Sequence, residues 1–114
     1  MEKEIFRGQI YFCNLRTDGY VTRGSHPVLI LQNDKGNRTS NTTIVAPITS
    51  RLNKRRCPSH VEVTPMDSGL YCASVIKCEQ LITVNKSDIG GYVGEVKEEI
   101  MQEVAAAIRR HLDI

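Results

Sequence analysis

The sequence predicts a mainly β domain that ends in an α-helix, an α+β arrangement built on an antiparallel barrel or strongly twisted sheet. About five or six short segments have the apolar or alternating pattern of strands, with no helical pattern between them, which is typical of small barrels. Only the last segment repeats its apolar residues at helical spacing. We expect one domain over residues 1–114, large enough that folding hides roughly two thirds of the unfolded surface.

The first part of the chain predicts two strands joined by a polar loop. Residues Gly8 to Leu15 predict a strand, because Ile10, Phe12 and Leu15 supply apolar side chains on alternating faces after Gly8, and a polar loop then runs as far as Pro27. The continuous apolar run from Val28 to Gln32 is typical of a strand that is covered on both faces. It ends at Asn33 to Asn37, a segment rich in turn-forming residues. We therefore expect a β-loop-β unit.

The middle of the chain predicts further short strands. Thr42 to Thr49 is rich in β-branched residues, and Pro47 indicates an edge or a bulge near its end. Gly69 breaks the chain, and the polar segment Asn85 to Gly91 predicts a loop. More strands are expected at His60 to Val63, Ala73 to Ile76, and Gln80 to Val84.

The C-terminal segment predicts an amphipathic helix. Val96, Ile100, Val104 and Ile108 recur every four residues and form a one-sided apolar stripe. Glutamates precede and begin this segment, and basic residues crowd its end, a distribution that complements the helix dipole.

Composition excludes some classes of protein and site. The formal net charge of +2 is too small to indicate nucleic-acid binding by itself. The four cysteines contain no Cys-x-x-Cys pair and follow neither a signal peptide nor a long apolar span, so we expect reduced thiols in a cytoplasmic protein. Cys57 and His60 have a spacing that suits zinc, but no second pair completes a site. We expect no metal site and no cofactor.

His26 is the first candidate for catalysis, because the turn-forming segment Gly24 to Pro27 delivers an ionisable group to the start of a buried strand. Three segments are expected to meet at this end of the sheet, namely Thr17 to His26, Thr49 to Arg56, and Glu79 with Gln80. Together they supply an imidazole, hydroxyls, an amide and several cations. This set suits phosphodiester cleavage by an internal 2′-hydroxyl, which needs proton transfer and groups that stabilise the phosphorane.

Each of these residues also has an ordinary structural interpretation. A histidine before a proline is often a turn residue, and Thr49 can simply end a strand. Glu79 and Gln80 can hydrogen-bond backbone edges instead of substrate. The basic run from Arg51 to Arg56 fits a solvated loop as well as a phosphate-contacting patch.

The chain resembles the MazF/PemK family of toxins from bacterial toxin–antitoxin pairs along nearly its whole length. The resemblance rests on ordered motifs: Arg7 to Phe12 (RGQIYF), Pro27 to Asn37 (PVLILQNDKGN), Ile44 to Thr49 (IVAPIT), Pro58 to Val63 (PSHVEV), Cys78 to Leu81 (CEQL), and Thr83 to Lys86 (TVNK).

The resemblance implies an SH3-like small barrel, normally a homodimer, with a small cognate antitoxin whose tail occupies the RNA groove. It implies a metal-independent endoribonuclease that cuts single-stranded RNA, as an mRNA interferase, to 2′,3′-cyclic phosphate and 5′-hydroxyl ends. It also places two catalytic groups at His26 and Thr49. The residues then expected to contact RNA are Thr22, Arg23, Ser25, Ser50, Arg51, Lys54, Glu79 and Gln80.

The chain departs from the family pattern at the first catalytic position, where His26 replaces an arginine, and at Ile82, which also replaces an arginine. An imidazole suits proton transfer near neutral pH, whereas a guanidinium is a permanent, bidentate phosphate ligand. The substitution thus leaves three functions open. One is an active ribonuclease, another is a catalytically weakened RNA-binding relative, and the last is a toxin that targets gyrase in the manner of the CcdB proteins.

Overall fold

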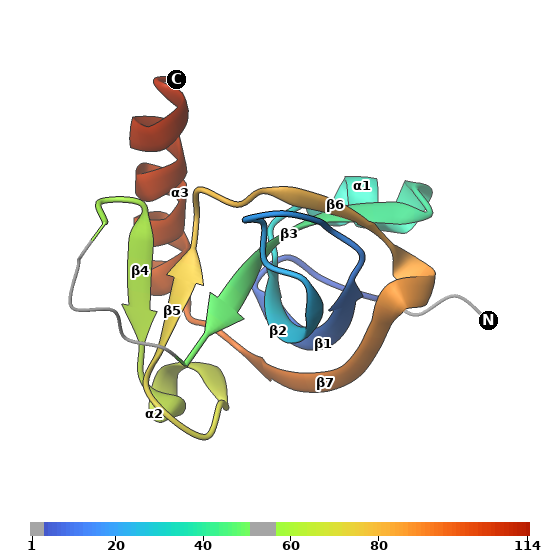
Figure 1. Ribbon diagram of the computed structural model, residues 1–114, viewed down its shortest axis with the longest axis horizontal. Helices are drawn as coiled ribbons and strands as arrows, with labels where there is room; N and C mark the ends of the chain where they lie inside the picture. Colours follow the sequence, from blue (N-terminus) through green and yellow to red (C-terminus); the bar gives the residue numbers. More distant parts are fainter. Residues whose placement is uncertain (1–3, 51–56) are drawn as a thin grey trace.

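The computed structural model describes residues 4–50 and 57–114. Its strands form a seven-stranded sheet in the order β4-β5-β3-β2-β1-β7, with β6 paired to β3 (Figure 1). All pairings are antiparallel. In chain order the elements are β1 (Gln9–Leu15), β2 (Gly24–Ile30), α1 (Asp34–Thr39), β3 (Thr42–Thr49), β4 (His60–Val63), α2 (Pro65–Ser68), β5 (Ser74–Lys77), β6 (Ile82–Asn85), the 3-10 helix η1 (Lys86–Asp88), β7 (Ile89–Glu95) and α3 (Glu98–Leu112).

Strand β3 organises the sheet because it changes partners along its length. Its first half pairs with β6 from Thr42 to Val45, and its last two residues, Ile48 and Thr49, pair with β5. Pro47 lies between these two pairings, where a residue without an N–H group is tolerated. The described pairings of β3 contain no register shift, so the edge or bulge predicted at Pro47 takes the form of a gap between two partner strands on one side of β3.

Two apolar clusters lie on opposite faces of the strands. One is packed between the sheet and α3, where Met101, Val104 and Ala107 meet sheet residues such as Leu29 and Ile48. The other is enclosed by the curved strands β1, β2, β3, β6 and β7 seen in Figure 1. The mainly β architecture with a C-terminal helix is therefore as predicted. No helix in the described residues is long and apolar enough to cross a bilayer.

The largest correction near the candidate site concerns the start of β2. The strand begins at Gly24, so the segment Gly24 to Pro27, interpreted from the sequence as a turn, belongs to the sheet. Its residues pair with β1, with Leu15 opposite Gly24 and Cys13 opposite His26. Pairing with β1 outweighs the turn preference of glycine and proline. His26 therefore sits on a strand and not on a loop.

Several elements were missed by sequence reasoning. The turn-rich segment after β2 forms α1, whose first turn is capped by the Asn33 side chain accepting a hydrogen bond from the Gly36 N–H at 2.8 Å. Thr64 and Asp67 form a capping box that starts α2. The predicted loop over Asn85 to Gly91 is wrong, because it contains η1 and the start of β7. The glycines of β7 remove the apolar alternation by which a strand is recognised.

Candidate active site

His26 and Thr49 lie at the same end of the β2–β3 ladder. The β2–β3 ladder runs from Ile30 opposite Val45 to Val28 opposite Pro47. His26 and Thr49 each lie two residues beyond that last pair, His26 near the start of β2 and Thr49 at the end of β3. Thr49 is held there by its pairing with Val75 on β5. Both residues therefore lie at one end of the β2–β3 ladder, and their joint role in a site stays a prediction.

The residue opposite His26 on β1 is Cys13, whose thiol is neutral. Side chains at alternate positions share a face of a strand, so His26 shares its face with Val28 and Ile30 of the second cluster. Its partner Cys13 is buried, and burial, with a smaller contribution from Asp88, raises the pKa of the Cys13 thiol to about 11. At neutral pH this thiol carries no charge and gives His26 no ionic partner.

The loop that precedes β2 is held by the segment that connects β5 to β6. The Thr22 backbone N–H donates to Gln80 Oε1 at 2.9 Å, and Lys77 Nζ donates to Thr22 Oγ1 at 3.4 Å. Within the loop, the Thr17 hydroxyl donates to the Thr22 carbonyl oxygen. Lys77 brings a cation to this cluster, and sequence reasoning missed it although it directly precedes the Cys78 to Leu81 motif.

The Glu79 carboxylate contacts the residues at the start of β4. Its carboxylate accepts a hydrogen bond from Ser59 Oγ at 3.2 Å and lies 3.1 Å from His60 Nε2. Both side chains are largely buried, with exposed fractions of 17% for His60 and 26% for Glu79. Glu79 therefore links the segment between β5 and β6 to the start of β4. Among residues 4–50 and 57–114, no group of three or more His, Cys, Asp or Glu side chains is arranged to hold a metal ion.

The remaining predicted RNA contacts lie on exposed surface. Arg23 Nη1 is 3.9 Å from Asp18 Oδ1, and both side chains are largely exposed. Ser25 is exposed and pairs with Asn14 of β1. Its side chain is on the opposite face of β2 from that of His26. Ser50 is exposed directly after β3. Arg51 and Lys54 lie outside the described residues.

Replacing Gln80 with alanine is expected to release the loop before β2. The substitution removes the acceptor of the Thr22 N–H, and one such hydrogen bond contributes about 0.5–1.5 kcal/mol. Amide exchange at Thr22, followed by NMR, should then accelerate roughly 2- to 12-fold. Gln102→Ala, on the exposed side of α3, is the matched control and should leave this rate unchanged. Equal exchange in both variants would show that the loop is held by other contacts.

The chain is similar in sequence to toxins of one family. A sequence model of the PemK-like, MazF-like toxin of type II toxin-antitoxin systems matches residues 6–112. The Endoribonuclease EndoA of Bacillus subtilis strain 168 is 38% identical over 104 residues, which cover 90% of this chain and 90% of the relative. The Endoribonuclease MazF of Staphylococcus saprophyticus is 40% identical over 103 residues, which cover 90% of this chain and 86% of the relative.

Solved structures share the fold. An endoribonuclease from a mycobacterial species, in complex with its cognate antitoxin, is 29% identical with a TM-score of 0.79 over 96% of each chain. MazF from Deinococcus radiodurans has a TM-score of 0.85, covering 99% of this chain and 100% of that one, at 19% identity. At that identity the likeness shows the fold alone, and it agrees with the mainly β architecture predicted from the sequence.

Proposed function

Because the chain belongs to the family of PemK-like, MazF-like toxins of type II toxin-antitoxin systems, we propose that it is an endoribonuclease acting on single-stranded RNA. The reaction is attack of a ribose 2′-oxygen on the adjacent phosphorus. A 2′,3′-cyclic phosphate forms, the bond to the 5′-oxygen breaks, and that oxygen leaves as a hydroxyl. The proton lost by the 2′-hydroxyl passes to a base, and an acid supplies the proton of the leaving oxygen.

The observation that carries this proposal is the register that brings His26 and Thr49 to the same end of β2 and β3. An imidazole there transfers a proton, and the Thr49 hydroxyl hydrogen-bonds a phosphate oxygen. Lys77 and Arg23 add positive charge from the two segments that border this end. These groups supply proton transfer and charge stabilisation without a metal ion.

The same proposal includes partners. We assign the protein a small cognate antitoxin, a homodimeric state and a cytoplasmic location. The mycobacterial relative solved with its cognate antitoxin supports the first of these. The dimer is consistent with a sheet whose end strands, β4 and β7, have no second strand partner within the described chain.

The test is incubation of the purified protein with a long single-stranded RNA in excess EDTA, followed by mapping of the fragment ends. We expect cleavage at preferred sequences, with 2′,3′-cyclic phosphate and 5′-hydroxyl ends. Activity that disappears with the chelator and returns with a divalent cation would overturn the metal-independent mechanism. RNA that is bound but left uncut would favour a catalytically weakened RNA-binding relative. A supercoiling assay with gyrase covers the remaining alternative.

A further inference from the structure

Lys77 of β5 lies on the same face of the sheet as His26 and Thr49. Side chains of paired residues, and of every second residue along a strand, share a face. Lys77 lies two positions along β5 from the partner of Thr49. His26 and Thr49 are in turn each two positions from the pair formed by Val28 and Pro47. Three strands therefore carry an imidazole, a hydroxyl and an ammonium group on the face that is turned away from α3.

The ammonium group of Lys77 also contacts the loop that leads into β2. Its Nζ donates to Thr22 Oγ1 at 3.4 Å, and Thr22 precedes His26 by four residues. An ammonium group has three donor hydrogens, so two remain after the bond to Thr22. Lys77 is partly buried, and solvent ions screen a partly buried charge less than an exposed one. The contact thus holds a weakly screened positive charge beside the start of β2.

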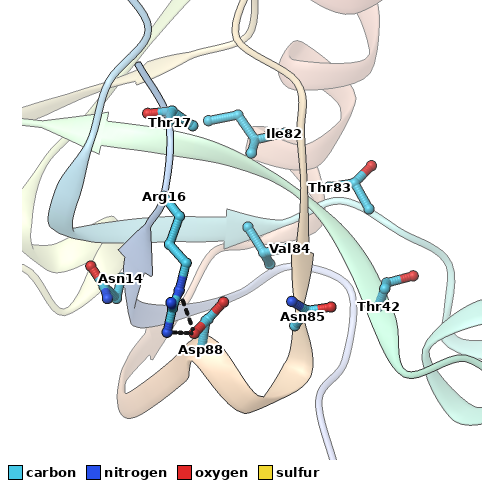
Figure 2. A pocket seen from close by; sticks show the side chains of 9 residues that line it. All are labelled: Asn14, Arg16, Thr17, Thr42, Ile82, Thr83, Val84, Asn85 and Asp88. Carbon is cyan, nitrogen blue, oxygen red and sulfur yellow. Dashed lines mark hydrogen bonds and ion pairs between the residues drawn. The ribbon is translucent and has the colours of Figure 1, made fainter.

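No carboxylate neutralises this charge. Within residues 4–50 and 57–114, no ion pair includes Lys77. The two arginines that flank the loop before β2 differ in this respect. Arg16 Nη2 is 3.0 Å from Asp88 Oδ1 (Figure 2), and Arg23 Nη1 is 3.9 Å from Asp18 Oδ1. Of these three cations, Lys77 is the one whose charge is left for an external anion.

The carboxylate that is nearest to Lys77 along the chain is engaged elsewhere. Glu79, two residues further on, accepts a hydrogen bond from Ser59 Oγ and lies 3.1 Å from His60 Nε2. Its two oxygens are therefore occupied by residues at the start of β4. An anion that approaches Lys77 meets the ammonium group without an acidic side chain bonded to it.

A phosphate is the anion that this arrangement suits. An imidazole transfers protons and a hydroxyl is neutral, so neither His26 nor Thr49 supplies a permanent positive charge. The ammonium group of a lysine is a compact permanent charge that binds phosphate oxygens. Negative charge on those oxygens grows as the phosphorane forms, and a cation fixed beside them stabilises that transition state.

We propose that Lys77 binds the phosphate at which the RNA is cleaved and supplies the permanent positive charge that His26 and Thr49 lack. The inference rests on the proposed ribonuclease function. Lys77 then acts on both steps, because its charge attracts the RNA and also stabilises the phosphorane. Loss of the charge should accordingly weaken the salt dependence of RNA binding and slow cleavage.

The test compares wild type with Lys77→Met, Lys77→Gln and Lys77→Arg. Single-turnover cleavage of one defined single-stranded RNA gives the rate. Binding is measured over a range of salt concentrations with the same RNA carrying a 2′-O-methyl group on every ribose, so that the attacking hydroxyl is blocked. Lys77→Met and Lys77→Gln should lower the cleavage rate roughly 10- to 160-fold, the effect of losing a hydrogen bond to a charged group. Both should also reduce the slope of log affinity against log salt by about 0.7, the value for one phosphate contact with a single strand.

The substitutions at Lys77 separate its charge from its contact with the loop. Lys77→Gln keeps hydrogen-bond donors for the Thr22 hydroxyl but has no charge, whereas Lys77→Arg keeps the charge. The proposal requires that arginine retains the salt slope of wild type and that glutamine loses it. A Lys77→Gln protein with the rate and slope of wild type would show that Lys77 only holds the loop, and would overturn the proposal.

Lys35→Met is the matched control, because it removes the same charge from an exposed position. Lys35 lies on α1, next to the start of β3, whereas Thr49 ends that strand (Figure 1). The cleavage rate and the salt slope of Lys35→Met should equal those of wild type. A loss of slope as large as that of Lys77→Met would show that the effect reports net charge and not a contact, and would also overturn the proposal.

The outcomes separate this inference from the proposed function. Cleavage by wild type with unchanged rates and slopes in every Lys77 variant would remove Lys77 from the site and leave the ribonuclease in place. Binding whose slope falls in Lys77→Met and Lys77→Gln, without cleavage by wild type, would support the phosphate contact and overturn catalysis. A wild-type protein that neither binds nor cuts the RNA would overturn both.

Discussion

Substituting His26 with alanine is expected to lower the rate of RNA cleavage by roughly 100-fold or more, the usual contribution of a positioned general acid or base. The loss follows from the proposed role of the imidazole, which lies near the start of β2 at the same end of the β2–β3 ladder as Thr49. Alanine removes the imidazole that transfers the proton and leaves the Thr49 hydroxyl, which hydrogen-bonds the phosphate, in place. Single-turnover cleavage of one defined RNA measures the effect.

His111→Ala is the matched control for this substitution. His111 is exposed near the end of α3, so its loss should change neither the cleavage rate nor the melting temperature. The melting temperature of His26→Ala is recorded alongside, because His26 is partly buried and paired with β1. A rate within about threefold of wild type in a folded His26→Ala protein would remove His26 from the mechanism, since a general acid or base contributes far more than that.

His26→Arg separates an altered catalyst from a disabled one. The family resemblance places an arginine at this position, and a guanidinium donates two hydrogen bonds to a phosphate. If the imidazole is a working replacement, both wild type and His26→Arg cut RNA. If wild type is inert while His26→Arg cuts, the chain has kept the scaffold of a toxin and lost the chemistry.

The parts of the fold that were predictable from the sequence are those whose signal is local. The β-branched run from Thr42 to Thr49 gives β3 its observed bounds, and the four-residue apolar spacing gives α3. The family motifs placed His26 and Thr49 in the site. Short helices such as α1 and α2 were missed because single caps, at Asn33 and Thr64, define them instead of a repeating pattern.

The supporting contacts of the site were not predictable, because they join residues far apart in the chain. Gln80 reaches Thr22 across 58 positions, and Glu79 reaches His60 across 19. Residue type indicates that these side chains can form hydrogen bonds, but only the register of β4, β5 and β2 decides with which partner. The start of β2 was misassigned for the same reason, since its pairing with β1 overrides the local preference for a turn.

The second large effect is expected at Gly94 of β7, where the strand passes directly under α2. A Cβ atom added to Gly94 would lie 2.1 Å from the backbone oxygen of Ser68 and 3.2 Å from the Cα of Gly69. The obstacle is backbone and cannot rotate away. Gly69, which ends α2 with a positive φ of 79°, is equally close from its own side, because a Cβ added there would lie 2.7 Å from the backbone oxygen of Val93.

Gly94→Ala should therefore lower the free energy of unfolding by about 1–3 kcal/mol or more, the cost of overpacking, and lower Tm by roughly 4 °C or more for each kcal/mol. Thermal unfolding followed by circular dichroism measures the shift. Gly91→Ala is the control on the same strand, because a Cβ there meets nothing within 4 Å and its effect should stay within about 0.5 kcal/mol. Equal melting temperatures for the two variants would show that α2 moves away from β7 at little cost. A fall in melting temperature confined to Gly94→Ala would show that β7 has glycine at this position because α2 leaves no room for a side chain. The same glycine weakens the strand pattern in the sequence.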